Sequence, residues 1–184
     1  MFAQIITTVQ SDQTQALGQH IGAILTHTIL KDSGQLQSKA PAAEAFVIAL
    51  HGDLGAGKTT LTQGIAAGLG VTQPVTSPTY TLVNEYALDN KFTLAHVDSY
   101  RLADSGDGAS SKIEAAALGI GLDELLDDDH VILIIEWASY LADLLPADHL
   151  AITLAHDADH PDNRHITIQP FGARGQAILD ALDS

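Results

Sequence analysis

The sequence has 184 residues, a length that suits one domain and permits a sizeable hydrophobic core. Eight basic residues against 23 acidic ones give a formal charge of −15 and an isoelectric point near 4.6, which argues strongly against direct binding of nucleic acid by this surface. The sequence has no cysteine, no N-terminal signal segment and no apolar stretch of about 18 residues, which excludes disulfides, thiol nucleophiles and transmembrane helices. We therefore expect a cytoplasmic protein with one domain over residues 1–184 and no membrane association.

An edge strand and an amphipathic helix are predicted in the N-terminal segment. Residues 4–9 suit a short edge strand, and Ser11 or Asp12 is suited to cap the helix that follows. The helix would place four apolar side chains on one face: Leu17, Ile21, Ile24 and Leu25. Residues 31–44 are polar, rich in small side chains and contain a glycine and a proline, so we expect a flexible, exposed connection there.

A complete phosphate-binding loop comes next. Residues 46–50 form a continuous apolar run, typical of a strand buried on both faces of a parallel sheet. Residues 52–59 read Gly-x-x-x-x-Gly-Lys-Thr, and apolar residues recur every four positions after them, which predicts an amphipathic helix. The helix N-terminus and the glycine-rich backbone would bind phosphate, Lys58 would reach the β- and γ-phosphates, and Thr59 would ligate Mg²⁺. The motif and both flanks predict a nucleotide-binding protein.

The remaining elements predict the fold. Two β-prone segments at 79–86 and 91–100 surround a short polar turn and predict an antiparallel hairpin. The most apolar run of the chain, 131–135, predicts a central strand. The other expected elements are a flexible loop at 104–111, a helix at 113–126 interrupted at 119–121, a second hairpin from 150–154 and 165–168, and a last helix at 176–182. The expected class is α/β: a P-loop NTPase-like three-layer fold with a mostly parallel central sheet plus antiparallel hairpins.

Carboxylates at two strand ends are candidates for the second half of the site. Phosphate-loop NTPases need a carboxylate near Mg²⁺ at the C-terminal end of an apolar strand, and Glu136 occupies that position. Its carboxylate would bind the metal through water or orient the attacking water, and the sequence leaves both roles open. Asp98 ends a second apolar stretch, where it is either a further site carboxylate or the ion-pair partner of Arg101. Nearby hydroxyls either sense the γ-phosphate as a switch or simply form a turn: Ser77, Thr79 and Thr81.

Five motifs together resemble those of the bacterial TsaE (YjeE) family. They are Gly-Asp-Leu-Gly-Ala-Gly-Lys-Thr-Thr at 52–60, Thr-Ser-Pro-Thr-Tyr-Thr-Leu-Val-Asn-Glu-Tyr at 76–86, His-Val-Asp-Ser-Tyr-Arg-Leu at 96–102, Gly-Leu-Asp-Glu at 121–124 and Ile-Glu-Trp at 135–137. The phosphate loop alone is shared by many NTPases, whereas its combination with the second and the last motif is highly specific. The resemblance covers residues 10–30 and 46–170.

The resemblance implies an ATPase needed for threonylcarbamoylation of the N6 of adenosine 37 in tRNAs that read ANN codons. In that family, TsaC makes threonylcarbamoyl-adenylate, TsaD with TsaB transfers the group to tRNA, and TsaE binds that pair and hydrolyses ATP. The expected ligands are ATP and Mg²⁺, and the expected partners are the TsaD and TsaB proteins. The negative charge of the chain agrees with a subunit that leaves the tRNA to its partners.

Carried over by position, the resemblance implies Lys58, Asp98 and Glu136 as catalytic residues, with Thr59, Glu136 and Asp98 on Mg²⁺. ATP would be bound by the phosphate loop, by a family arginine and by the N-terminal segment near the adenine: Ser11, Asp12, Asp53, Leu54, Gly55, Ala56, Gly57, Lys58, Thr59, Thr60 and Arg164. Residues 31–44 and 104–111 are longer than the corresponding family connections. The second of these follows the Asp98 motif and therefore bears on partner docking.

Three other functions compete with this interpretation. A GTPase is disfavoured because residues 90–93 lack the aspartate of an Asn-Lys-x-Asp guanine reader. A small-molecule kinase typically needs several arginines to clamp two phosphate groups. This chain has only three, Arg101, Arg164 and Arg174, which makes a kinase the weaker enzyme alternative. A nucleotide-gated binding subunit would dock its partner in the ATP state with negligible turnover. We expect slow hydrolysis without partners, because no arginine is evidently placed as a finger in cis.

Overall fold

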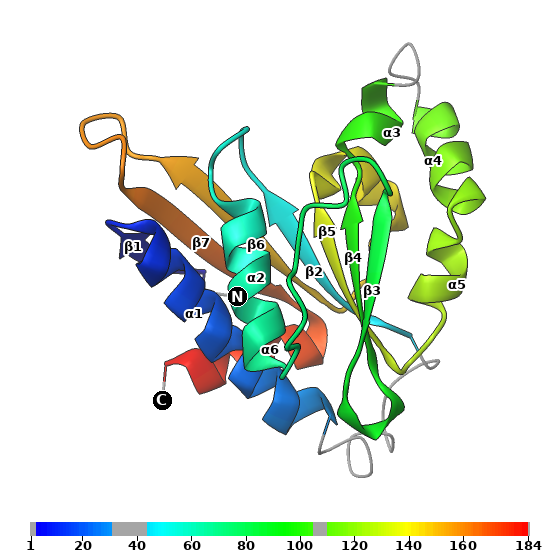
Figure 1. Cartoon of the computed structure of the whole chain (residues 1–184), viewed down its shortest axis with the longest axis horizontal. Helices are drawn as coiled ribbons and strands as arrows, with labels where there is room; N and C mark the ends of the chain where they lie inside the picture. The colour runs from blue at the N-terminus through cyan, green and yellow to red at the C-terminus, as the bar shows by residue number, and fades with distance from the viewer. Residues whose placement is uncertain (1–2, 31–43, 105–109, 184) are drawn as a thin grey trace.

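The computed structural model describes residues 3–30, 44–104 and 110–183, and its centre is a sheet of seven strands (Figure 1). The strands lie in the order β1-β7-β6-β2-β5-β4-β3. Their bounds are Gln4–Thr8 for β1, Phe46–His51 for β2, Val83–Ala87 for β3, Thr93–Asp98 for β4, Val131–Glu136 for β5, His149–His156 for β6 and Arg164–Phe171 for β7. The central strands β6, β2, β5 and β4 are parallel to their neighbours in that group, whereas β1, β7 and β3 pair antiparallel. The expected α/β class with its mostly parallel central sheet is confirmed.

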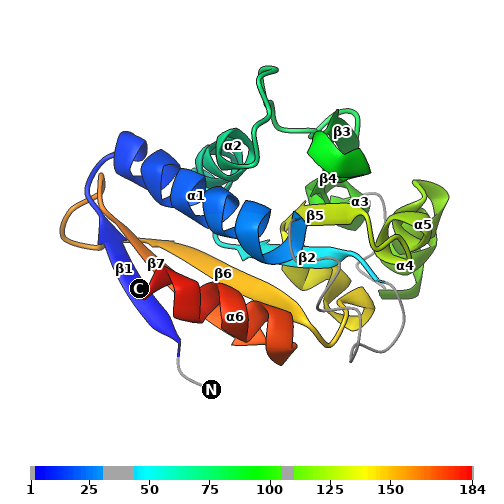
Figure 2. The same cartoon turned by 90° about the horizontal axis from the view of Figure 1, so that it is seen from below.

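Helices cover both faces of the sheet and complete three layers (Figures 1 and 2). One face packs against α1 (Ser11–Leu25), which continues into the π-turn η1 (Thr26–Leu30), and against α2 (Lys58–Gly68) and α6 (Gly172–Leu182). The other face packs against α3 (Tyr100–Asp104), α4 (Ser110–Gly119), α5 (Leu122–Leu126) and the 3₁₀ segment η4 (Ala138–Leu144). None of the helices in the described part of the chain is long and apolar enough to cross a membrane.

The side chains of each central strand alternate between two hydrophobic cores, because successive side chains point to opposite faces of the sheet. On β5, Ile132 and Ile134 join the core under α1, α2 and α6, and Leu133 and Ile135 join the core under α3 to α5. This burial on both faces explains why the sequence of β5 is continuously apolar. The last residue of β5, Glu136, pairs in register with Asp98 of β4, so both predicted carboxylates end their strands side by side.

Helices α1 and α2 lie side by side on the sheet (Figures 1 and 2) and approach closely through glycines. A Cβ placed on Gly22 would lie closer than 3.0 Å to the carbonyl oxygen of Ile65, and one on Gly64 would meet that of Gln15 equally closely. This contact places the N-terminus of α1 beside the loop that begins α2, and it thereby joins the N-terminal segment to the predicted nucleotide site.

Several predicted boundaries are corrected. The helix cap predicted at Ser11 or Asp12 is wrong, because Gln10 is the extended N-cap residue and makes no side-chain cap bond. Strand β3 starts at Val83 and not at 79, because Leu82 has a left-handed φ of 66° that ends the preceding turn. Tyr100 begins α3, so the hairpin strand β4 ends at Asp98.

The two connections that were expected to be flexible fall largely outside the described residues. That is true of 31–43 and of 105–109, whereas Asp104 belongs to α3, and residues 110 and 111 begin α4, contrary to the loop expected at 104–111. The last helix, α6, starts at 172 and not at 176. The N-terminal edge strand, both hairpins, the central position of β5 and the helix break between α4 and α5 are confirmed.

Candidate nucleotide-binding site

The phosphate loop joins the C-terminal end of β2 to the N-terminus of α2, as the motif predicts. Gly52 has a φ of 136°, and a Cβ there would collide with the carbonyl oxygen of Leu154 on the neighbouring strand β6. Gly57 is the left-handed N-cap of α2, with a φ of 102°. Only glycine adopts these conformations at little cost, so the loop wraps tightly and directs amides toward the start of the helix. The resulting concavity is suited to bind an anion.

Lys58 begins α2 and is buried within the loop. Its Nζ donates hydrogen bonds to the carbonyl oxygens of Gly52 at 2.7 Å and Asp53 at 2.9 Å. It also lies 3.8 Å from the ring centroid of Trp137, a favourable cation–π distance. Burial lowers the pKa of Lys58, and the nearby carboxylates, of which Glu136 contributes most, oppose that shift. A cation held by neutral groups in a desolvated loop is suited to attract a phosphate.

Glu136 ends β5, is 3 % exposed and accepts hydrogen bonds from two directions. The hydroxyl of Thr59 donates to its carboxylate, with Oγ1 at 2.9 Å from Oε1 and 3.1 Å from Oε2. Nε2 of the fully buried His96 lies 2.9 Å from Oε1. The following residue, Trp137, has a left-handed φ of 60°, which turns the chain sharply and places its indole against Lys58.

Asp98 lies beside Glu136 at the end of β4 and is also 3 % exposed. Its carboxylate accepts hydrogen bonds from Thr79 at 2.8 Å, Ser77 at 3.2 Å and the amide of Tyr100 at 3.1 Å. No ion pair joins Asp98 to Arg101 among the described residues, and the Arg101 guanidinium lies over the ring of Tyr80 instead. The ion-pair alternative is therefore wrong.

Of the three hydroxyls in the predicted switch segment, the structure brings two to the site. Ser77 and Thr79 hydrogen-bond to each other at 2.7 Å and both reach Asp98, whereas Thr81 donates to Asn84. The segment thus connects directly to a carboxylate at the end of β4. This connection is consistent with the switch interpretation, since a change at Asp98 would be transmitted to the exposed segment around residue 80.

Two adjoining pockets surround the loop. One, of about 320 Å³, is lined by Lys58, Thr59, Asp98 and Glu136, together with Ser77, Thr79 and Trp137. The hydroxyl and carboxylate oxygens on its walls are the donors that Mg²⁺ prefers, so the residues present fit that ion. The chemistry of this pocket requires the ends of three elements, β4, β5 and α2, to meet at one edge of the sheet.

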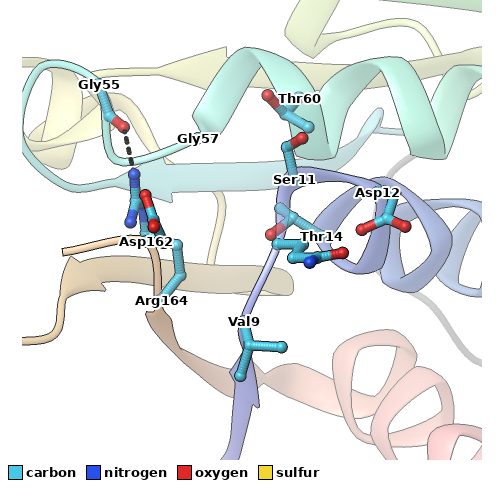
Figure 3. Close-up of a pocket in the computed structure, with 10 residues that line it drawn as sticks. Val9, Ser11, Asp12, Thr14, Gly55, Gly57, Thr60, Asp162 and Arg164 are labelled. Atoms are coloured by element: carbon cyan, nitrogen blue, oxygen red, sulfur yellow. Dashed lines mark hydrogen bonds between the residues drawn. The ribbon is translucent and has the colours of Figure 1, made fainter. Parts of the chain in front are cut away.

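The second pocket, of about 580 Å³, lies between the phosphate loop, the start of α1 and Arg164 (Figure 3). It is lined by Ser11 and Asp12 from the start of α1, and by Thr60 and Arg164. It shares Gly55, Gly57 and Thr60 with the first pocket, so both pockets adjoin the phosphate loop. Their combined space is of the size that small-molecule sites occupy.

Arg164, at the start of β7, donates hydrogen bonds to backbone carbonyls of the phosphate loop. Its Nη2 donates to the carbonyl of Gly55 at 3.3 Å (Figure 3). Its Nε donates to the carbonyl of Ala56 at 3.1 Å. Its Nη1 donates to the carbonyls of Pro161 and Asn163 in the connection between β6 and β7. The guanidinium therefore binds carbonyl oxygens on both sides and ties that connection to the phosphate loop.

The predicted site residues meet around the loop with two differences of detail. Asp53 and Ala56 do not line either pocket but contribute backbone carbonyls, to Lys58 and to Arg164 respectively. Sequence reasoning missed His96 and Ser99, both of which contact Glu136. A signal for His96 was present, since it lies two positions before Asp98 and therefore on the same face of the strand.

Comparison with known proteins identifies the family of the chain. A family model described as "Threonylcarbamoyl adenosine biosynthesis protein TsaE" matches residues 8–166. The protein named tRNA threonylcarbamoyladenosine biosynthesis protein TsaE in Haemophilus influenzae is 33% identical over 154 residues, which cover 84% of this chain and 89% of that relative. The protein of the same name in Bacillus subtilis is 39% identical over 136 residues, covering 74% of this chain and 77% of the relative.

A solved structure shares the fold. The crystal structure of YdiB from Bacillus subtilis matches with a TM-score of 0.69 and 30% sequence identity, covering 99% of this chain and 95% of that chain. The family match spans the phosphate loop, both buried carboxylates and Arg164. The chain therefore belongs to the TsaE family of threonylcarbamoyl adenosine biosynthesis proteins.

Proposed function

We propose that the protein is the ATP-binding and ATP-hydrolysing subunit that acts with TsaD and TsaB in N6-threonylcarbamoylation of adenosine 37 of tRNAs that read ANN codons. One observation carries the proposal: Lys58, Thr59, Asp98 and Glu136 line a single pocket at the N-terminus of α2. This is the set of groups that phosphoryl transfer to water needs, namely phosphate binding, oxygen ligands for a metal and a buried carboxylate.

Each residue has a part that follows from its place. The amides at the start of α2 and the Lys58 ammonium bind the phosphates, and Lys58 exchanges its two loop carbonyls for phosphate oxygens. Thr59, Asp98 and Glu136 would hold Mg²⁺, which supplies positive charge to the developing phosphate oxygens when bound. Glu136 or Asp98 orients the attacking water. The pocket between α1 and Arg164 receives the base and ribose.

The charge of the chain and its family support the proposed partners. With a formal charge of −15 the chain is poorly suited to hold tRNA, so the TsaD and TsaB proteins would bind the tRNA in the cytoplasm. None of the three arginines lines the pocket around Glu136, and Arg164 is occupied by backbone carbonyls. A partner would therefore complete the electrostatic environment, and turnover by the isolated protein would be slow.

The decisive experiment measures steady-state ATP hydrolysis by the protein alone and with purified TsaB and TsaD. We expect strong stimulation by the partners, no hydrolysis and no ATP binding by Lys58→Ala, and ATP binding without turnover by Glu136→Gln. Gln is matched in shape to Glu but lacks the charge, so it separates the carboxylate from its packing. Normal turnover by Glu136→Gln would contradict the role given to Glu136.

A nucleotide-gated binding subunit with negligible turnover is the second candidate. The observation that favours it is the lack of any arginine side chain on the walls of the pocket around Glu136. On this alternative, ATP would promote docking to TsaD and TsaB, but the same mixture would release no phosphate above the Lys58→Ala background. Docking measured in parallel with phosphate release distinguishes the two functions.

A further inference from the structure

Strand β4 carries a buried histidine, His96, between a core leucine and the carboxylate of Asp98. Leu94, His96 and Asp98 alternate along one face of β4, next to Ile134 and Glu136 of β5. Leu94 and Ile134 are fully buried in the core beneath α2, and His96 is also 0 % exposed. An aliphatic side chain at 96 would satisfy this environment, so the packing of the core alone gives no reason for a histidine.

The hydrogen bonds of His96 are incomplete and point in one direction. Nε2 lies 2.9 Å from Oε1 of Glu136, and Nδ1 is buried without a hydrogen-bond partner among the described residues. Because a carboxylate accepts hydrogen bonds, Nε2 must carry the hydrogen in this contact. Nδ1 then has no partner in the described part of the chain, as the acceptor of a neutral imidazole or as the donor of a charged one, and its removal from water costs free energy that a leucine would not incur. The one bond that His96 gains is the bond to Glu136.

The backbone beside Glu136 is already fixed by another residue of the same segment. Ser99 donates to the carbonyl oxygen of Glu136 twice, from its amide at 3.2 Å and from Oγ at 2.9 Å, and its Oγ also reaches the carbonyl of Trp137. What remains free is rotation of the carboxylate itself. Its other partner is Thr59, which belongs to the nucleotide-binding loop, whereas His96 belongs to the rigid central sheet.

We infer that His96 is a positioning residue, which holds Oε1 of Glu136 through its Nε2–H and so keeps Oε2 directed at the metal and water side of the pocket. The inference rests on the proposed hydrolysis of ATP for its effect on turnover, but the geometry it assigns to Glu136 does not. Mutation of a residue that orients a metal ligand or a base in this way typically lowers metal affinity or activity about 10- to 100-fold.

The test compares three substitutions that differ in where they place a donor. In His96→Gln the amide nitrogen lies the same number of bonds from Cα as Nε2 does, so the donor is kept. In His96→Asn the amide reaches only the place of Nδ1, and in His96→Leu the donor is lost. We expect the Asn and Leu variants to lower kcat about 10- to 100-fold with the KM for ATP changed less than about threefold, and the Gln variant to recover most of the rate.

Stability separates positioning from a structural role. His96→Leu should unfold at about the same temperature as the natural protein, because removing a half-satisfied imidazole offsets the hydrogen bond that Glu136 loses, while its turnover falls. Turnover by His96→Leu at the natural rate, or an equal loss in the Gln and Leu variants, would overturn the inference.

A measurement without turnover keeps the inference testable if the natural protein proves not to hydrolyse ATP. Two-bond ¹H–¹⁵N correlation spectra of the ¹⁵N-labelled protein should show His96 as the Nε2–H tautomer, its signals identified by their loss in His96→Gln. The Mg²⁺ concentration for half-maximal ATP binding should rise in His96→Leu and not in His96→Gln. An Nδ1–H tautomer would overturn the inference even if hydrolysis is normal, whereas absent hydrolysis with the Nε2–H tautomer and the Mg²⁺ shift would contradict only the proposed function.

Discussion

The close contact between α1 and α2 predicts that Gly64→Ala destabilises the protein, although alanine is the better helix former. A Cβ on Gly64 would lie closer than 3.0 Å to the backbone carbonyl oxygen of Gln15, where ordinary contacts begin at 3.4 Å. The obstacle is backbone and not the end of a flexible side chain, so the helices themselves must separate. Such a shift cannot be absorbed by a change of rotamer.

The magnitude follows from two opposing terms. Replacing glycine by alanine inside a helix stabilises it by about 1 kcal/mol. Overpacking a tight contact costs about 1–3 kcal/mol, and more where backbone must move. Opening the contact by about 1 Å also forfeits a quarter to a half of the dispersion energy of the atoms it separates. We therefore expect the free energy of unfolding to fall by about 2 kcal/mol, and Tm by about 4 to 8 °C.

Urea and thermal unfolding followed by circular dichroism provide the assay, with Gly119→Ala as the matched control. Gly119 ends α4, and a Cβ there would have no atom within 4 Å. This control should leave stability unchanged or raise it by about 0.5 kcal/mol. ATP affinity should also weaken in Gly64→Ala, because residues of both α1 and α2 line one pocket beside the phosphate loop. If Gly64→Ala proves as stable as Gly119→Ala, the helices are not in the close contact on which the reasoning depends.

Three further predictions concern the site. Arg164→Ala should weaken ATP binding, measured by calorimetry, about 10-fold, because two loop carbonyls lose charge-assisted hydrogen bonds. Unchanged affinity would show that the loop keeps its conformation without Arg164. Burial, with a smaller contribution from His149, lowers the pKa of His51, so below pH 6.5 the unfolded chain binds more protons and stability falls as the pH falls. As the pH falls from 6.5 to about 5, the free energy of unfolding of His51→Gln should therefore decrease less than that of the natural protein. An equal decrease in both proteins would show that burial of His51 does not cause the pH dependence. Because Trp137 is the only tryptophan and Lys58 lies over its ring, ATP should change the intrinsic fluorescence in the natural protein and not in Lys58→Ala.

The sequence by itself determined the parts of the site that depend on local order. A buried strand, a glycine-rich loop and a helix follow one another without interruption at 46–68, and the phosphate loop was therefore predicted in full. Glu136 and Asp98 were found because each ends an apolar strand, and the carboxyl ends of parallel strands share one edge of the sheet. The helix cap predicted at residue 11 or 12 is wrong. Ser and Asp are residue types that favour the N-cap position, but Gln10 has the extended backbone of that position in the structure.

Only the tertiary structure decided which distant side chains meet. His96 reaches Glu136 because β4 and β5 are neighbours in a register that pairs Asp98 with Glu136. Arg164 reaches the phosphate loop because the chain returns from β6 to β7 beside it. Hydrophobic pattern gives the two faces of each strand but neither the order of the strands nor their register. The contacts that orient the carboxylates and the phosphate loop are therefore set by packing across the sheet, which no local segment encodes.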